Sequence, residues 1–134
     1  MPAIAYLGDL SLLHDLGGLQ IAARHAIPLM VVVAANDGGG IFHHLPQAAL
    51  GETFERLFAT PHGLDLAPAA ALGRARHTRA RTIGELRARL AAWRVAPALE
   101  LVEVPTDRER NVRVHRDIVA AALARLDAHL RAAA

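Results

Sequence analysis

The 134-residue chain contains no cysteine and no lysine. Without cysteine it has no disulfide bond, no thiolate zinc site and no cysteine nucleophile. Without lysine it has neither a Schiff-base lysine nor the lysine of the usual phosphate-binding loop. All 15 basic residues are therefore arginines, and with 13 acidic residues they give a formal net charge of only +2.

Long apolar runs and aromatic residues are also scarce. No run approaches the roughly 18 residues of a membrane span, and the N-terminus has no signal-peptide pattern, so we expect a cytoplasmic protein. One Trp, one Tyr and three Phe cannot form the stacking surface that single-stranded nucleic acids require, so no nucleic-acid partner is predicted. The arginine cluster over 74–89 is accordingly interpreted as a solvated face.

The apolar pattern alternates between strands and helices, and 53% hydrophobic residues suffice for one core. Strands are predicted over 3–7, 29–35, 77–80 and 99–104. Helices are predicted over 12–24, 65–72, 83–94 and from 112 onward, with a functional loop and a short helix between 41 and 66. This order predicts a three-layer α/β domain in which a mostly parallel sheet has helices on both faces.

Polar turns follow the first two predicted strands. Gly8-Asp9-Leu10-Ser11 ends the first strand, and Asn36 opens an Asn-Asp-Gly-Gly-Gly turn 27 residues after Asp9. This spacing matches one strand–helix–strand unit, so both turns are expected at the sheet edge where open α/β sheets bind ligands. Carboxylate, amide and carbonyl oxygens suit Mg²⁺ bound to a diphosphate. Taken alone, the same residues also suit ordinary turns.

The residues around these turns carry a family resemblance. Gly8-Asp9 with Asn36 resembles the thiamine-diphosphate-binding signature. The chain from about Ala5 to the last helix is similar to the C-terminal part of the menaquinone-pathway 2-succinyl-5-enolpyruvyl-6-hydroxy-3-cyclohexene-1-carboxylate synthases. The segments that carry this resemblance are 8–16, 38–47, 54–65 and 106–111.

The resemblance implies a set of site residues. It makes Asp9, Asn36 and the Gly38 carbonyl the ligands of Mg²⁺ or Mn²⁺, and Ile41, Phe42 and Leu45 the residues that line the substrate. It implies that thiamine diphosphate is bound by Gly8, Asp9, Leu10, Ser11, Asn36, Gly38, Gly39 and Ile41. Asp37 stands where many relatives carry a second Asn. Its negative charge would repel a diphosphate unless it points away.

The resemblance also implies a reaction and partners. The family decarboxylates 2-oxoglutarate with thiamine diphosphate and adds the succinyl carbanion equivalent to isochorismate. Residues 1–134 would be a partial, N-terminally incomplete diphosphate-binding (PP) domain, without the pyrimidine-binding and central domains. The activating glutamate belongs to the pyrimidine-binding domain, so no catalytic residue is assigned here, and Glu52 and Glu55 are not given that role.

Three interpretations of such a chain stay open. It is an inactive fragment or truncated product, or a subunit that works with a partner carrying the pyrimidine-binding domain, or a non-enzymatic interaction domain that keeps the fold. Exposed apolar surface and self-association into a homo-oligomer are expected. Other candidates are interpreted structurally: His43 and His44 as surface or locally bonded groups, and Phe54 with Phe58 as packing residues.

Overall fold

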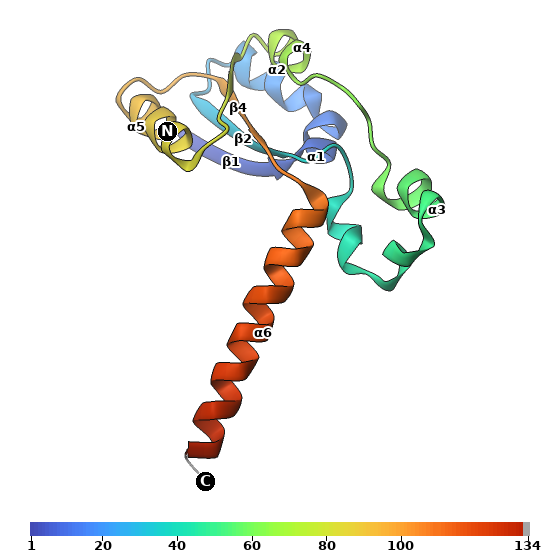
Figure 1. Cartoon of the computed structure of the whole chain (residues 1–134). Helices are drawn as coiled ribbons and strands as arrows, with labels where there is room; N and C mark the ends of the chain where they lie inside the picture. Colours follow the sequence, from blue (N-terminus) through green and yellow to red (C-terminus); the bar gives the residue numbers. More distant parts are fainter. Residues whose placement is uncertain (133–134) are drawn as a thin grey trace.

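A four-stranded parallel sheet forms the centre of the protein (Figure 1). The computed structural model describes residues 1–132. The strands stand in the order β1-β2-β4-β3, and each neighbouring pair is parallel. Their bounds are β1 Ala3–Gly8, β2 Leu29–Ala35, β3 Arg76–Arg79 and β4 Glu100–Pro105. The predicted parallel sheet is confirmed, with β1 and β3 at its two edges.

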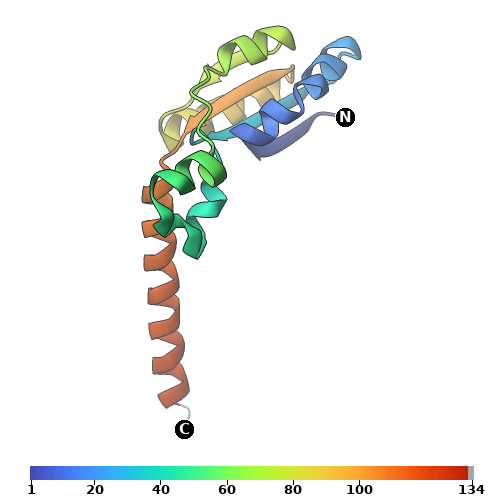
Figure 2. The same ribbon diagram turned by 90° about the vertical axis from the view of Figure 1, so that its right-hand side faces the viewer.

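Helices cover both faces of the sheet, as predicted (Figures 1 and 2). One face carries α1 (Asp9–His14), α2 (Leu16–Arg24) and α4 (Ala67–Leu72), and the other carries α5 (Ile83–Val95). Four short helical turns fill the predicted loop: η1 Gly40–His44, η2 Pro46–Leu50, α3 Glu52–Phe54 and η3 Glu55–Ala59. The last helix, α6 (Arg108–Ala132), extends away from the sheet.

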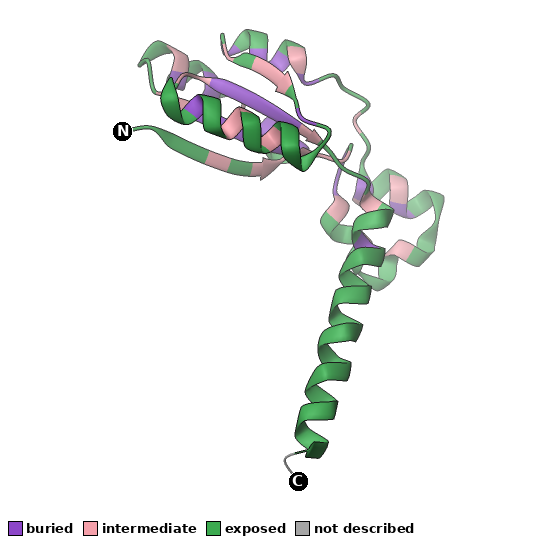
Figure 3. Ribbon diagram, turned by 60° about the vertical axis from the view of Figure 1, so that its left-hand side comes forward, coloured by how far each residue is buried: buried purple, intermediate pink, exposed green. Residues whose placement is uncertain are grey.

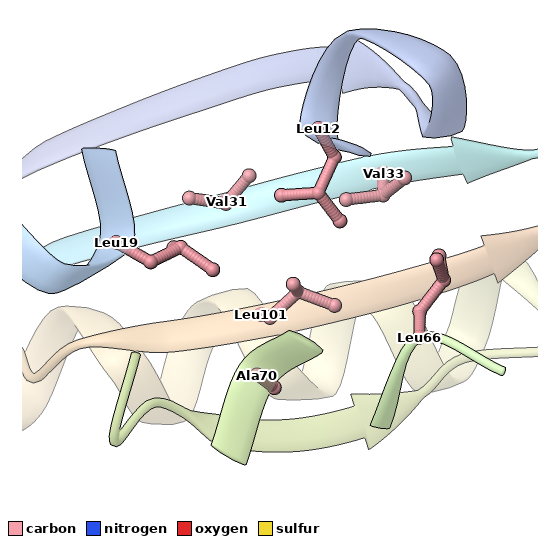
Figure 4. Close-up of a cluster of buried hydrophobic side chains, with 7 residues drawn as sticks. All are labelled: Leu12, Leu19, Val31, Val33, Leu66, Ala70 and Leu101. Carbon is pink, nitrogen blue, oxygen red and sulfur yellow. The ribbon is translucent and has the colours of Figure 1, made fainter. Parts of the chain in front are cut away.

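Two apolar layers hold the helices to the sheet. On one side, Leu12 and Leu19 pack with Val31, Val33, Leu66, Ala70 and Leu101 (Figure 4). On the other, Trp93 packs with Met30, Val32, Ala80 and Val102. Its indole N–H donates a 2.7 Å hydrogen bond to the Ala98 carbonyl. Because β2 is covered on both faces, its sequence is continuously apolar and does not alternate.

The first helix differs from the prediction in two ways. It begins at Asp9, with Gly8 as its N-cap, three residues before the predicted start at residue 12. It also breaks at Asp15, and α2 begins one residue later. Gly18 therefore lies in the first turn of α2, where a Cβ would meet the Asp15 carboxylate at 3.4 Å. Gly18 leaves room for the Asp15 carboxylate. The spacing of apolar residues could not predict this contact.

The last helix begins at Arg108, four residues before the predicted start. The carboxylate of Asp107 accepts the N–H of Arg110 at 2.6 Å, which is a typical N-terminal capping contact. In α6 Val112 is buried and Arg108 is half-buried, and the other residues of the helix are exposed (Figure 3). Its predicted apolar face is thus open along Ile118, Val119, Ala122, Leu123, Leu126 and Leu130.

Exposed apolar side chains also lie on the edge strand β1, where Ile4 and Tyr6 are 52% and 76% exposed. The expected exposed apolar surface is therefore present, while self-association stays a prediction. Among the helices of residues 1–132, none is both long and apolar enough to cross a membrane.

Two buried glutamates on β4 bind arginines of the predicted solvated cluster. Glu100 is fully buried and accepts both Nε and Nη2 of Arg89, the latter at 2.6 Å. Glu103 accepts Nε and Nη2 of Arg79 at 3.0 and 3.1 Å. Hydrogen bonds to these carboxylates raise the pKa of both guanidinium groups. The interpretation as a solvated face holds for Arg79, which is exposed although it binds Glu103, and is wrong for Arg89, whose side chain is only 24% exposed.

Candidate functional site

The turns that follow β1 and β2 meet at the carboxyl edge of the sheet. Asp9 is only 1% exposed, and its Oδ2 accepts three backbone N–H groups from the turn after β2. The donors are Asn36 at 2.8 Å, Asp37 at 2.6 Å and Gly38 at 3.3 Å. The other oxygen, Oδ1, accepts the N–H of Leu10 at 2.8 Å. One carboxylate therefore joins the two turns, at the place that the spacing predicts.

Three oxygen atoms at this junction keep capacity for a cation. Asn36 Oδ1 is buried and has no hydrogen-bond partner in the described residues. Asp9 Oδ1 carries a single hydrogen bond, and the Gly38 carbonyl accepts only the N–H of Gly40 at 2.9 Å. A buried acceptor without a partner is costly, and its occurrence in a native site needs an explanation. A hard cation such as Mg²⁺ fits this donor set.

No competing cluster of ligands is present in residues 1–132. Within that range no group of three or more His, Cys, Asp or Glu side chains could hold a metal ion. The cation donor set at the junction is of a different kind, because an amide oxygen and a backbone carbonyl accompany one carboxylate.

Asp37 turns its carboxylate away from the junction. Its backbone is left-handed, with φ of 59°, and its Oδ1 accepts the N–H groups of His62 at 3.0 Å and Gly63 at 2.7 Å. The side chain is half exposed. The negative charge therefore binds the loop after η3. Asp37 nevertheless borders the same cavity as Asp9.

His62 completes the junction and was given no role from the sequence. Its Nδ1 accepts the N–H of Leu64 at 3.0 Å, which places the ring proton on Nε2. That atom lies 3.4 Å from Asp9 Oδ2, and the side chain is only 12% exposed. His62, Asp9 and Asp37 border one cavity. The only local signal is the position of His62 between Pro61 and Gly63, which indicates a turn.

The glycines of the second turn are required by the protein's own backbone. The Gly39 N–H donates to the Ala59 carbonyl at 2.7 Å. A Cβ on Gly38 would collide with the same carbonyl oxygen, and Gly38 has φ of +132°. A Cβ on Gly39 would collide with the Phe58 carbonyl. The backbone of η3 therefore lies so close to Gly38 and Gly39 that neither position has room for a Cβ.

The remaining predicted residues lie around the junction. Gly8 is extended, and Ser11 is exposed on α1. Ile41, Phe42 and Leu45 are 76%, 38% and 43% exposed on and just after η1. These side chains are thus apolar and accessible, although each would normally favour burial.

The aromatic residues predicted to pack do so. The rings of Phe54 and Phe58 are stacked with centroids 5.8 Å apart, and Phe54 is 2% exposed. The ring of His43 meets Phe54 edge-on at 4.7 Å, and its Nε2 lies 3.5 Å from Glu55 Oε1. His43 is therefore a locally bonded residue, as predicted.

Sequence comparisons confirm the resemblance to one synthase family. No family model matches the chain. It is 50% identical over 120 residues to the 2-succinyl-5-enolpyruvyl-6-hydroxy-3-cyclohexene-1-carboxylate synthase of Myxococcus xanthus and 46% identical over 117 residues to that of Chloroflexus aurantiacus. These matches cover 88% and 87% of the chain and 20% of each synthase. The chain thus spans about one fifth of the length of the curated relatives it matches.

Solved structures confirm the fold. The chain superimposes on benzoylformate decarboxylase from Polynucleobacter necessarius with a TM-score of 0.69 and 18% identity. It superimposes on the thiamine diphosphate-dependent 4-hydroxybenzoylformate decarboxylase of Rhodococcus jostii with a TM-score of 0.68 and 25% identity. These matches cover 80% and 79% of the chain and 20% of each neighbour. The three-layer α/β architecture is therefore the thiamine-diphosphate-binding fold.

Proposed function

From the similarity of this chain to one fifth of the menaquinone-pathway synthases, we propose that it binds the diphosphate end of thiamine diphosphate through Mg²⁺. The observation that carries the proposal is the buried, unpartnered Oδ1 of Asn36, a residue whose backbone N–H is bound by Asp9. Asn36 Oδ1, a carboxylate oxygen of Asp9 and the Gly38 carbonyl supply three oxygen ligands. The remaining positions around the cation belong to diphosphate oxygens and water.

The two oxygen atoms of the Asp9 carboxylate have different roles in this proposal. Oδ2 is occupied by three amide N–H groups and by the nearby His62 ring, so it holds the turn in place. Oδ1 has one N–H partner and is the oxygen that we assign to the cation. Gly8, Leu10, Ser11 and Gly39 form the surrounding backbone on which the diphosphate would lie. Ile41, Phe42 and Leu45 present apolar side chains toward the reacting part of the cofactor and the substrate.

The whole reaction needs more than this chain. When bound, thiamine diphosphate supplies the electron sink for decarboxylating 2-oxoglutarate and for transferring the succinyl unit to isochorismate. We assign no catalytic acid or base to these residues. Glu55 already binds Arg108 at 3.2 Å and lies beside His43, which supports excluding it as the activating glutamate. A pyrimidine-binding domain, on another polypeptide or elsewhere in a longer chain, would have to complete the enzyme.

Cofactor binding is tested by titrating the chain with thiamine diphosphate in Mg²⁺ and, separately, in a chelator. We expect heat release and thermal stabilisation in Mg²⁺ only, and inorganic diphosphate should reproduce part of both. Asn36→Ala should respond much more weakly, with a Kd about 100-fold or more higher. Asn111→Ala is the matched control, because Asn111 is exposed on α6. Equal responses from the wild type and Asn36→Ala would refute the assignment.

The reaction is tested by adding the chain to a polypeptide that carries the other four fifths of the Myxococcus xanthus synthase. We expect the mixture to consume 2-oxoglutarate and isochorismate, while neither component does so alone. Cofactor binding without turnover in this mixture would retain the site and reject the carboligase assignment.

A further inference from the structure

The turn η1 carries two of the proposed substrate-lining residues but cannot hold its own shape. It is a single 3₁₀ helix of five residues, none of which is buried, and its N-cap has no side-chain hydrogen bond. Such short helical segments are marginal in isolation, so their orientation comes from tertiary contacts. The contacts of η1 therefore decide where Ile41 and Phe42 point.

An ionic chain runs from the start of α6 to η1. Arg108, the first residue of α6, binds Glu55 on η3 through Nη2 and Oε2 at 3.2 Å. The other oxygen of Glu55 lies 3.5 Å from Nε2 of His43 on η1. One carboxylate thus links three segments that are distant in sequence. Arg108 also passes beside Gly40, where a Cβ would meet its Cγ at 3.4 Å.

Burial distinguishes this chain from ordinary surface pairs. The side chains of Arg108 and His43 are only 18% and 10% exposed, while the side chain of Glu55 between them is 45% exposed. For comparison, Arg113 Nη1 lies 3.6 Å from Glu109 Oε2 on α6, and these side chains are 64% and 79% exposed. Exposed pairs of that kind contribute little, whereas a partly buried arginine on a carboxylate is stronger and geometrically specific.

We propose that Arg108 is a positioning residue, which acts through Glu55 and His43 to orient η1 and its apolar side chains for the substrate. The role of Ile41 and Phe42 in this inference rests on the proposed function. The ionic chain that orients η1 does not, because all its contacts exist without cofactor. Neutralising Arg108 releases Glu55, which loosens η3 and η1 together and leaves the sheet intact.

Amide hydrogen exchange of the cofactor-free chain, read by mass spectrometry over 40–59, tests this positioning role. In Arg108→Gln the exchange of this segment should speed up by about two- to fivefold, the range expected for losing one partly exposed ion pair. The charge-swapped variant Arg108→Glu with Glu55→Arg re-forms the ion pair between α6 and η3 but not the contact with His43, so it should restore slow exchange over 55–59 only. Arg113→Gln is the matched control and should leave the segment unchanged.

The fold is checked in the same samples through Trp93, which is buried against the opposite face of the sheet. Its fluorescence should be the same in all variants. Unchanged exchange over 40–59 in Arg108→Gln would overturn the proposal, and so would a charge-swapped variant that stays as loose over 55–59 as the single one. Because no cofactor is present, these outcomes are independent of whether thiamine diphosphate binds.

Discussion

Replacing Asn36 by alanine should separate the function of the junction from its stability. In the cofactor-free chain, Asn36 Oδ1 is a buried acceptor without a partner. Such an atom costs about 1–3 kcal/mol, and truncation removes that cost together with a few packing contacts. We therefore expect the free energy of unfolding of Asn36→Ala to equal or exceed that of the wild type.

With ligand bound, we expect the wild type to be more stable than Asn36→Ala. Losing a residue outside the metal's direct coordination already weakens metal binding about 10- to 100-fold, so losing a direct ligand should cost about 100-fold or more. At a ligand concentration of about 100 times the wild-type Kd, ligand binding stabilises the wild type by about 2.7 kcal/mol. The same concentration stabilises a variant with a 100-fold higher Kd by about 0.4 kcal/mol.

Thermal unfolding with and without Mg²⁺ and thiamine diphosphate measures both effects. For a domain of this size each kcal/mol shifts Tm by roughly 3–6 °C, so the reversal is well within reach of the method. A variant that is destabilised in the absence of ligand by more than about 1 kcal/mol would show that Asn36 has structural partners, against the assumption of an orphaned acceptor. Equal ligand-induced shifts in both proteins would refute the metal assignment itself.

Three further substitutions test the packing around the junction and the sheet. Asp9→Ala should lower the free energy of unfolding by about 3 kcal/mol or more in urea titrations, because three amide donors lose their acceptor; a loss below about 1 kcal/mol would contradict this. Gly38→Ala should cost about 2 kcal/mol or more, since its Cβ meets the Ala59 carbonyl at a left-handed φ, and an unchanged Tm would disprove the collision. Arg89→Met should cost about 3–5 kcal/mol by leaving buried Glu100 without its main partner, and Glu100→Leu added to it should recover most of the loss.

The layered fold follows from the sequence because its signal is local. The continuous apolar run of β2 indicates a strand covered on both faces, and the Thr82 capping contact with Glu85 sets the start of α5. The helix boundaries were harder to predict from the sequence. The break at Asp15 and the early start of α6 depend on single side chains that bind backbone groups, and apolar periodicity carries no information about such contacts.

The site was predictable in position but not in bonding. Parallel strands bring their carboxyl ends together, so Asp9 and Asn36 had to be neighbours. Which oxygen accepts which N–H depends on how the turn after β2 lies over Asp9, and η3 fixes that turn from another part of the chain. The same dependence on tertiary structure hid His62, which reaches the site from a segment without strong periodicity. Arg108 lies in segment 106–111, which carries the resemblance, but its contact with Glu55 could not be read from the sequence.

The carboxylates of Asp9 and Asp37, both at the carboxyl edge of the sheet, therefore bind different parts of the chain. Asp9 lies inside and gathers the amides of the second turn, while Asp37 points outward and binds the loop that carries His62. Because the protein's own atoms make both contacts, the chain itself sets the shape of the turn, and binding costs little additional ordering. It follows that Asp9→Ala removes the scaffold along with a ligand, so its loss of binding is ambiguous. Asn36, whose oxygen holds nothing in the free protein, is the residue whose removal reports on the cation alone.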